Sequence, residues 1–311
     1  MKVQSVEGVK IEGVCACLPA ASADVAAADI VRATGIRTRR IAAKGTTPLD
    51  LCLAAARRVL DETQSALADF GAVLFVSFTH PDRMPAGAAQ AQGRLGLPQD
   101  IIALDVSLAC SGWGYGLYLA GLLVRETGKK VLLLDGDVQS ACVDPVDAST
   151  ASILADAGTA TVVGEGDGTW KFAFLSDGEK GAALKLPQGG TIAMDGFGVF
   201  KFVATDVVRF LKEFQAAAEA DAVDAFVPHQ ANAYMIRQLA KSLGVADEKL
   251  WISCDELGNS ASASVPVTLA FVGRREAKDR RVLFAGFGGG LSACAGEIAV
   301  SADCKLSVIE G

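Results

Sequence analysis

One cysteine, one histidine and one asparagine of this chain lie in contexts that suit covalent acyl chemistry. Cys110 lies at the junction of two apolar segments, the first expected to be a strand and the second a helix. The chain has two histidines, and one of them, His229, occurs in the sequence Val-Pro-His-Gln-Ala-Asn. Asn259 follows in Gly-Asn-Ser. A thiol can carry an acyl group when a base and hydrogen-bond donors assist it, so the three residues predict an acyl-transfer site.

The position of Cys110 predicts a reactive thiol. Unpaired backbone N–H groups and the positive end of the dipole at a helix N-terminus both lower a thiol pKa. We therefore expect Cys110 to be partly thiolate at neutral pH. Asn259 is expected to open a second helix, and small residues follow both positions, which lets a substrate approach the backbone closely.

Apolar segments of the buried-strand type alternate with segments of helical character along the chain. The clearest helix start is Thr47-Pro-Leu-Asp50, with a Thr cap, Pro at the first helical position and an acidic third residue. This alternation predicts an α/β fold with parallel strands. The expected strands are 72–78, 101–106, 131–134, 223–227 and 282–285.

The order of motifs in the first half is repeated in the second. His80 follows an expected strand as His229 does, and Cys110 precedes an expected helix as Asn259 does, each pair about 150 residues apart. A repeat of this length predicts a duplicated α/β domain whose copies pack face to face and bring equivalent helix starts to one pocket. The expected halves are residues 1–165, with the cysteine, and 166–311, with His229 and Asn259.

Composition narrows the class of protein. The chain has 311 residues, is 51% hydrophobic and carries a net charge of −7. Its apolar segments are shorter than the roughly 18 residues of a membrane helix, and its acidity gives no support for nucleic-acid binding. Most of the eight cysteines lie within apolar segments, which predicts reduced cysteines in the cytoplasm. We expect no metal site.

Six segments resemble, in order and spacing, motifs of the β-ketoacyl-acyl carrier protein synthase III family. The resemblance covers nearly the whole chain. It implies the thiolase fold, with the duplicated halves in a layered αβαβα arrangement, and a homodimer that works in fatty acid or polyketide biosynthesis. The segments are Thr34-Gly-Ile-Arg-Thr-Arg-Arg40, Thr79-His-Pro-Asp-Arg83, Ala109-Cys-Ser-Gly112, Val227-Pro-His-Gln-Ala-Asn232, Gly258-Asn-Ser-Ala-Ser-Ala-Ser-Val-Pro266 and Gly286-Phe-Gly-Gly-Gly-Leu291.

The resemblance also implies a role for each matching residue. Cys110 would take the acyl group from a thioester. His229 and Asn259 would hold the thioester carbonyl of a malonyl group and stabilise the enolate that remains when carbon dioxide leaves. The carbanion would attack the acyl-cysteine, and the backbone N–H groups of Cys110 and Gly289 would form the oxyanion hole. The product would be a β-ketoacyl thioester.

Further residues are assigned to the substrate by the same resemblance, and others to the carrier by their charge, because this chain has Ala233-Tyr234 where the family often has a basic residue. Arg37, Met84 and Phe287 are expected to contact substrate, with Met84 projecting toward the acyl pocket of the partner subunit. Three basic residues, Lys201, Arg237 and Lys241, are expected to form a patch for an acidic acyl carrier protein. The substrates would arrive on the phosphopantetheine of that carrier or of coenzyme A, and we expect no other cofactor.

Two positions depart from the family's pattern. Residues 26–33 have no aromatic residue where the family has a tryptophan that stacks on the adenine of coenzyme A. The second nucleotide-binding arginine is replaced within 148–150. We therefore expect coenzyme A thioesters to be poorer acyl donors than acyl carrier protein, with Trp113 and Trp251 as the remaining candidates for a stacking platform.

Other functions remain open on the sequence alone. An acyltransferase of the same fold would pass the acyl group to an alcohol or amine without decarboxylation. A papain-like protease also places Cys, His and Asn in this order, although the repeat and the strand–helix alternation argue against one. A non-catalytic subunit that binds acyl groups is disfavoured, because all three chemical residues are present.

Overall fold

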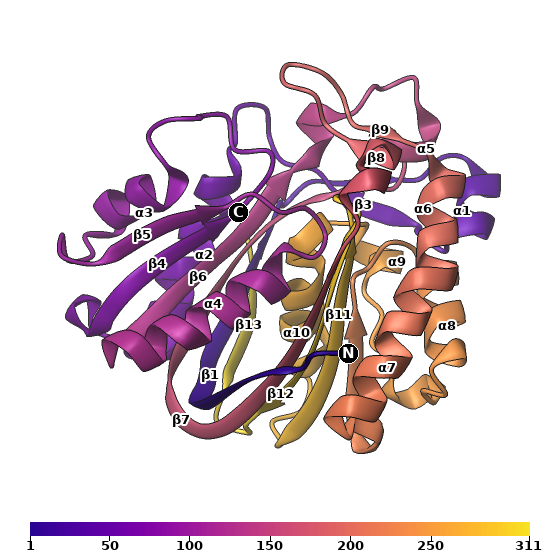
Figure 1. Cartoon of the computed structure of the whole chain (residues 1–311). Coiled ribbons are helices and arrows are strands. Elements are labelled where there is room, and N and C mark those ends of the chain that lie inside the picture. The colour runs from indigo at the N-terminus through magenta and orange to yellow at the C-terminus, as the bar shows by residue number, and fades with distance from the viewer.

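A computed structural model describes the backbone of residues 1–311 and every side chain except that of Asp221. Its main sheet is mixed and runs β10-β11-β12-β7-β6-β4-β5, with β1 beside β7 and β13 beside β1 (Figure 1). The strands of this sheet are β1 (Gln4–Leu18), β4 (Phe70–Val76), β5 (Ile102–Val106), β6 (Lys130–Val138), β7 (Asp156–Ser176), β10 (Ala225–Pro228), β11 (Arg280–Gly288), β12 (Ser292–Val300) and β13 (Lys305–Glu310).

Helices and short strand pairs complete the chain. The expected helix start at Thr47 is confirmed, because Thr47 and Asp50 form a reciprocal capping box ahead of α2. The helices are α1 (Ala28–Thr34), α2 (Pro48–Glu62), α3 (Gly87–Leu95), α4 (Gly112–Thr127), α5 (Ala148–Ala151), α6 (Gly196–Phe202), α7 (Val208–Ala218), α8 (Ala233–Ser242), α9 (Cys254–Leu257) and α10 (Ser264–Gly273), and the short pairs are β2 (Ser22–Asp24) with β3 (Thr38–Arg40) and β8 (Leu184–Lys185) with β9 (Ala193–Met194).

The sheet has the internal repeat that the sequence predicts. In the first half the strand order is β4-β6-β7-β1, and in the second it is β10-β11-β12-β7. The first two strands of each set are parallel, and the others are antiparallel to their neighbours. Every residue of β4 is buried, as expected of a strand covered by helices on both faces.

The two equivalent helices α4 and α10 lie between the two half-sheets. Leu117 of α4 and Leu269 of α10 share one buried cluster with Leu133 of β6 and Phe284 of β11. The middle layer is therefore helical and is packed on both sides by strands. Trp113, at the start of α4, is 1% exposed and its ring contacts the edge of Phe284.

Two further buried clusters attach the outer helices. Leu53 of α2 and Ala91 of α3 pack with Leu134 on the opposite face of the first half-sheet. Phe214 of α7 and Leu239 of α8 pack with strands of the second half-sheet, and these helices form the right-hand side of Figure 1. The layers therefore run αβαβα. Among the described residues, no helix is both long and apolar enough to cross a bilayer.

The two half-sheets are not separated by a linker, because they have the long strands β1 and β7 in common. β1 runs antiparallel to β7 along most of its length, and both strands curve at the bottom of Figure 1. The sequence-based division between residues 165 and 166 falls inside β7. The last strand, β13, returns to pair with β1 in the first half. Each half therefore contains segments from both ends of the chain.

Candidate active site

Cys110 lies in the turn that leads from β5 to α4, two residues before the helix begins. The end of β11 runs directly against it. A Cβ atom built on Gly288 would lie 2.8 Å from the Cys110 sulfur, and one on Gly286 would lie 2.7 Å from the carbonyl oxygen of Cys110. Both positions therefore require glycine, because any side chain would displace the nucleophile.

His229 follows β10 directly and is buried. Its backbone N–H donates to the carbonyl of Ala285, and the ring edge of Phe287 packs against its imidazole with centroids 5.4 Å apart. The ring Nδ1 faces two groups, the carbonyl oxygen of Ala261 at 3.0 Å and the hydroxyl of Ser264 at 2.8 Å. Nε2 is the ring nitrogen left to act on a substrate.

Asn259 is held by its backbone as well as by its side chain. Its carbonyl accepts from the side-chain amide of Gln139 at 2.8 Å. The side-chain Oδ1 accepts from the N–H of Ala261 at 3.0 Å, and Nδ2 donates to Ala231 O at 3.4 Å. Since an amide nitrogen carries two hydrogens, one N–H of Asn259 is left for a ligand.

The expectation that Asn259 opens a helix is wrong. A 3₁₀ turn, Ala261–Ala263, follows it, and α10 begins at Ser264. Ala261 has a φ of +51°, which is unfavourable for an alanine. The Asn259 side chain bonds to the N–H two residues on, a local bond that competes with helical hydrogen bonding and delays the helix.

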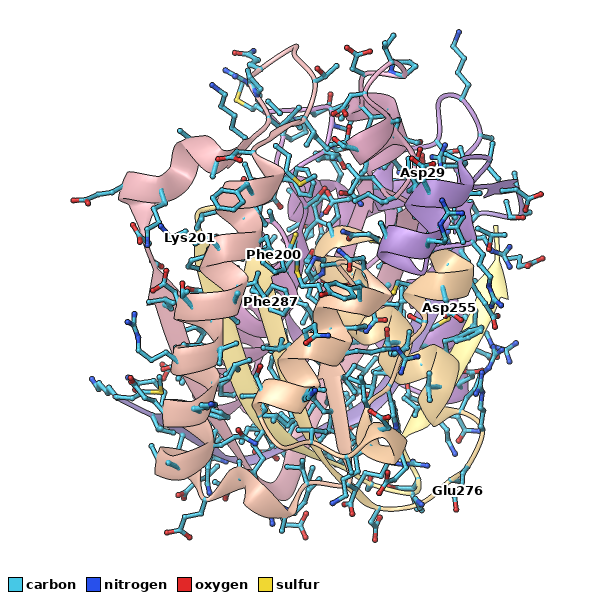
Figure 2. The ribbon with its side chains drawn as sticks, turned by 90° about the vertical axis from the view of Figure 1, so that its right-hand side faces the viewer. Asp29, Phe200, Lys201, Asp255, Glu276 and Phe287 are labelled. Carbon is cyan, nitrogen blue, oxygen red and sulfur yellow. The ribbon has the colours of Figure 1, made fainter. Side chains whose placement is uncertain are left out.

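A cavity of about 310 Å³ brings the predicted site residues together. It lies near the small end of the usual range for ligand pockets. In Figure 2 the right-hand side of Figure 1 faces the viewer, and two residues that line the cavity, Phe200 and Phe287, lie near the centre of the view. The predicted residues that line the cavity are Cys110, His229, Asn259, Phe287 and Gly289.

The ionisation of this site differs from the expectation of a reactive thiolate. Burial raises the pKa of the Cys110 thiol to about 12, and the carboxylates of Asp137 and Asp135 add to the shift, while the backbone N–H groups of Gly289 and Cys110 oppose it. The predicted thiolate at neutral pH is therefore wrong. Cys110 is half-buried at the cavity, and desolvation of its sulfur by the surrounding protein outweighs the effect of a helix that begins two residues further on.

His229 is shifted so that it stays neutral. Burial lowers its pKa to about 4, and the hydrogen bond to the Ala261 carbonyl opposes the shift. At neutral pH the site therefore contains a protonated thiol and a neutral imidazole. A proton must leave Cys110 before it can attack a thioester, and the imidazole is able to accept one.

The remaining predicted residues lie outside this cavity. Arg37 is exposed and forms ion pairs with Asp255 at 3.2 Å and Glu256 at 3.7 Å. The Met84 residue is 87% exposed on the loop before α3. The basic residues are exposed on two separate helices, Lys201 on α6, toward the edge of Figure 2, and Arg237 and Lys241 on α8. Their assigned roles stay predictions.

The apolar wall of the cavity was missed by the sequence reasoning. It comes mainly from the segment that contains β8, β9 and α6, whose short apolar stretches between Gly and Pro residues were the available signal. Asn232 is the N-cap of α8, where its side chain accepts from the N–H of Met235, and it also borders the cavity. The apolar wall residues include Leu184, Leu186, Ile192, Met194, Val199, Phe200 and Met235.

Both halves of the chain match models of one enzyme family. The model described as 3-oxoacyl-[acyl-carrier-protein] synthase III matches residues 104–178, which contain Cys110. The model of the C-terminal part of the same proteins matches residues 214–299, which contain His229, Asn259 and Gly289. A β-ketoacyl-[acyl-carrier-protein] synthase III of Serratia proteamaculans (strain 568) is 34% identical over 278 residues, 85% of this chain and 87% of that protein.

Solved structures show the same architecture. A 3-oxoacyl-(acyl-carrier protein) synthase from Burkholderia xenovorans LB400 superposes with a TM-score of 0.95 at 30% identity, over 100% of this chain and 99% of that one. The priming β-ketosynthase of the R1128 polyketide pathway gives a TM-score of 0.87 at 27% identity, over 97% of this chain and 98% of that one. The chain therefore belongs to the β-ketoacyl-acyl carrier protein synthase III family, and its layered architecture is the thiolase fold of that family.

Proposed function

We propose that this protein is a condensing enzyme that joins an acyl group to a malonyl thioester and releases carbon dioxide. The observation that carries the proposal is the convergence of Cys110, His229 and Asn259 on one cavity in a chain of this family. The reaction has three steps, namely acylation of the cysteine, decarboxylation of the malonyl group and formation of the carbon–carbon bond.

Acylation begins with a protonated thiol. His229 lies in the same cavity and is neutral, because burial lowers its pKa to about 4, so we assign its imidazole as the group that takes the proton from sulfur. Nε2 accepts the proton while Nδ1–H donates to the carbonyl of Ala261. The thiolate attacks the thioester carbonyl, the bond to the carrier sulfur breaks, and the imidazolium returns the proton to the departing carrier thiol.

Decarboxylation needs the same imidazole as a hydrogen-bond donor. When the Ser264 hydroxyl donates to Nδ1, the ring proton lies on Nε2 and points to the substrate. The free N–H of Asn259 supplies a second donor to the same thioester oxygen. Two donors at this oxygen stabilise the enolate as the bond to the carboxylate breaks. Because Nδ1 faces both a carbonyl and a hydroxyl, the site can hold either neutral tautomer of His229.

Condensation returns the enzyme to its starting state. The enolate carbon attacks the acyl carbonyl on Cys110, and negative charge develops on that oxygen. The backbone N–H groups of Gly289 and Cys110 face the sulfur and are suited to receive this charge. The carbon–sulfur bond then breaks, the cysteine thiolate takes up a proton from solvent, and the β-ketoacyl product leaves on the malonyl carrier.

The thioesters are carried on phosphopantetheine, and acyl carrier protein is the proposed carrier of the malonyl group. No cofactor is part of the proposal. Trp113 is buried inside the middle layer, and Trp251 packs under the guanidinium of Arg280 at 5.4 Å, so neither tryptophan is placed as a stacking platform. Phe200, which lines the cavity, is an exposed aromatic side chain, and Phe197 and Tyr234 are exposed next to lining residues in the sequence.

Intact-mass analysis tests the first step. The protein is incubated with an acyl thioester, and we expect one acyl adduct that is absent in Cys110→Ala. Cys294→Ala is the matched control, because Cys294 is a buried cysteine on β12 that plays no part in the proposed chemistry. An adduct that persists in Cys110→Ala would refute the assignment of the nucleophile.

A further inference from the structure

Two buried serines connect the segment of the nucleophile to the glycine turn opposite it. The hydroxyl oxygens of Ser111 and Ser292 lie 2.8 Å apart, and the Ser292 hydroxyl donates to the carbonyl of Gly289 at 2.7 Å. Ser111 is fully buried and Ser292 is 3% exposed. Ser111 follows Cys110 directly, so this chain of hydrogen bonds begins and ends beside the two backbone N–H groups assigned to the oxyanion hole.

The direction of each hydrogen bond follows from the groups present. A serine hydroxyl has one hydrogen, and a carbonyl oxygen can only accept. The hydrogen of Ser292 is therefore committed to Gly289, and the Ser111 hydroxyl must donate to Ser292. Because both side chains are buried, reversing this order would leave a buried carbonyl without its donor, which is costly.

Ser111 occupies a position where a serine usually has a different task. It is the N-cap residue of α4, and an N-cap hydroxyl normally accepts from an N–H of the first helical turn. Within the described part of the chain, the Ser111 hydroxyl makes no such capping bond. Its contact with Ser292 takes the place of the cap, and it connects α4 to β12.

The glycine turn, residues 288–290, has an unusual backbone conformation that other groups must stabilise. Gly288 has a φ of +154° and Gly290 a φ of +135°, conformations that side-chain-bearing residues avoid. Three successive glycines have little conformational preference of their own, so hydrogen bonds must fix the turn. Leu291 pairs through its backbone with Asp177, and the Ser292 hydroxyl holds the carbonyl of Gly289 itself. The same segment must keep the Gly289 N–H directed at Cys110.

We propose that Ser292, supported by Ser111, is a positioning residue that holds the oxyanion hole of Cys110 and Gly289. The inference rests on the proposed function, because the hole matters only if an acyl group is carried on Cys110. Acylation and carbon–carbon bond formation both place negative charge in this hole. Decarboxylation places the charge at His229 and Asn259 instead, so the loss of Ser292 should slow acylation and carbon–carbon bond formation and spare decarboxylation.

The expected effects are smaller than those of removing a donor directly. Loss of a direct oxyanion donor typically costs about 10²–10³ in rate, and we expect Ser292→Ala to slow acylation about tenfold. Ser111→Ala leaves the Ser292 hydroxyl in place and should slow acylation only about two- to threefold. Ser292→Thr keeps the hydroxyl and should restore most of the rate.

The experiment measures two rates for each variant. Single-turnover acylation of Cys110 is followed by quenched intact-mass analysis, and uncoupled decarboxylation by carbon dioxide release from malonyl-acyl carrier protein without an acyl donor. Ser65→Ala is the matched control, since Ser65 forms a similar hydroxyl–hydroxyl contact with Thr63 at 2.9 Å, beyond the end of α2. Thermal unfolding checks that each variant is folded.

Slow acylation in Ser292→Ala with an unchanged rate of carbon dioxide release, and rescue in Ser292→Thr, would support the inference. Equal acylation by Ser292→Ala and the parent would overturn it, and so would a parallel fall in both rates. If Ser292→Ala does not fold, Ser111→Ala decides by the same comparison of its two rates. A parent protein that acquires no acyl group on Cys110 would overturn the proposed function itself, and the inference with it.

Discussion

Replacement of Gly288 by alanine is expected to displace the nucleophile. The new Cβ would lie 2.8 Å from the sulfur and 2.9 Å from the Cβ of Cys110. Non-bonded carbon atoms pack at about 3.5–4.0 Å, so one side must move by roughly 1 Å. The φ of +154° at Gly288 adds a backbone cost on the order of 1–3 kcal/mol. A misplacement of about 1 Å at a reacting group can cost about 10²-fold, and we expect acylation to fall by that factor.

Single-turnover acylation measured by intact mass is the assay for this variant. Two glycine variants separate the causes of any loss. Gly45→Ala has the same kind of positive φ, +90°, but a Cβ there would have no atom within 4 Å, and Gly178→Ala has neither strain nor contact. Both controls should acylate at the parent rate. If folded Gly288→Ala also acylates at the parent rate, β11 does not press on Cys110 as described.

Four further predictions follow from the site. The acylation rate should be nearly flat between pH 6 and 9, because the thiol keeps its proton below about pH 12 and His229 is neutral above about pH 4. Acylation of His229→Ala should be slow, and its rate should rise about tenfold per pH unit. A parent rate that rises in the same way would show that the imidazole is not the base. Asn259→Ala should keep acylation and lose about 10²–10³ in carbon dioxide release, and a parent-like release rate would make the residue structural. Acyl-coenzyme A should acylate Cys110 at least about tenfold less efficiently than the same acyl group on carrier protein. Residues 26–33 have no aromatic side chain to stack on the adenine, and base–aromatic stacking is worth about 1–3 kcal/mol. Equal efficiency would contradict the expectation drawn from 26–33. The protein should be a homodimer by light scattering at micromolar concentration, because β5 is the last strand at one end of the sheet and its Ile102 and Leu104 are exposed apolar side chains. A monomeric mass would refute this.

The sequence predicts the architecture well because the repeat is visible in the order of its motifs. Alternating buried strands and helices indicate the layers, and the cap at Thr47 places the start of α2 correctly. The sharing of β7 between the two half-sheets is not predictable from local patterns. The strand stays extended through residues 165 and 166, and its partners come from both ends of the chain.

The site residues could be proposed from sequence, but their ionisation could not. A cysteine ahead of a helix suggests a thiolate, yet the pKa depends on how much protein surrounds the sulfur and on the carboxylates of Asp135 and Asp137 on β6. Likewise, only the folded chain shows that Ala261 adopts a positive φ and bonds to both His229 and Asn259. Contacts between residues distant in the sequence set these properties.

The most direct test of the proposed function follows the fate of the acyl group and of the malonyl carboxylate together. The enzyme is first acylated on Cys110, freed of excess donor, and then mixed with malonyl-acyl carrier protein. We expect carbon dioxide release equal to the amount of acyl-enzyme, return of Cys110 to its free mass, and a β-ketoacyl group on the carrier. Loss of the acyl group without carbon dioxide release, or carbon dioxide release with the acyl group still on Cys110, would contradict the account.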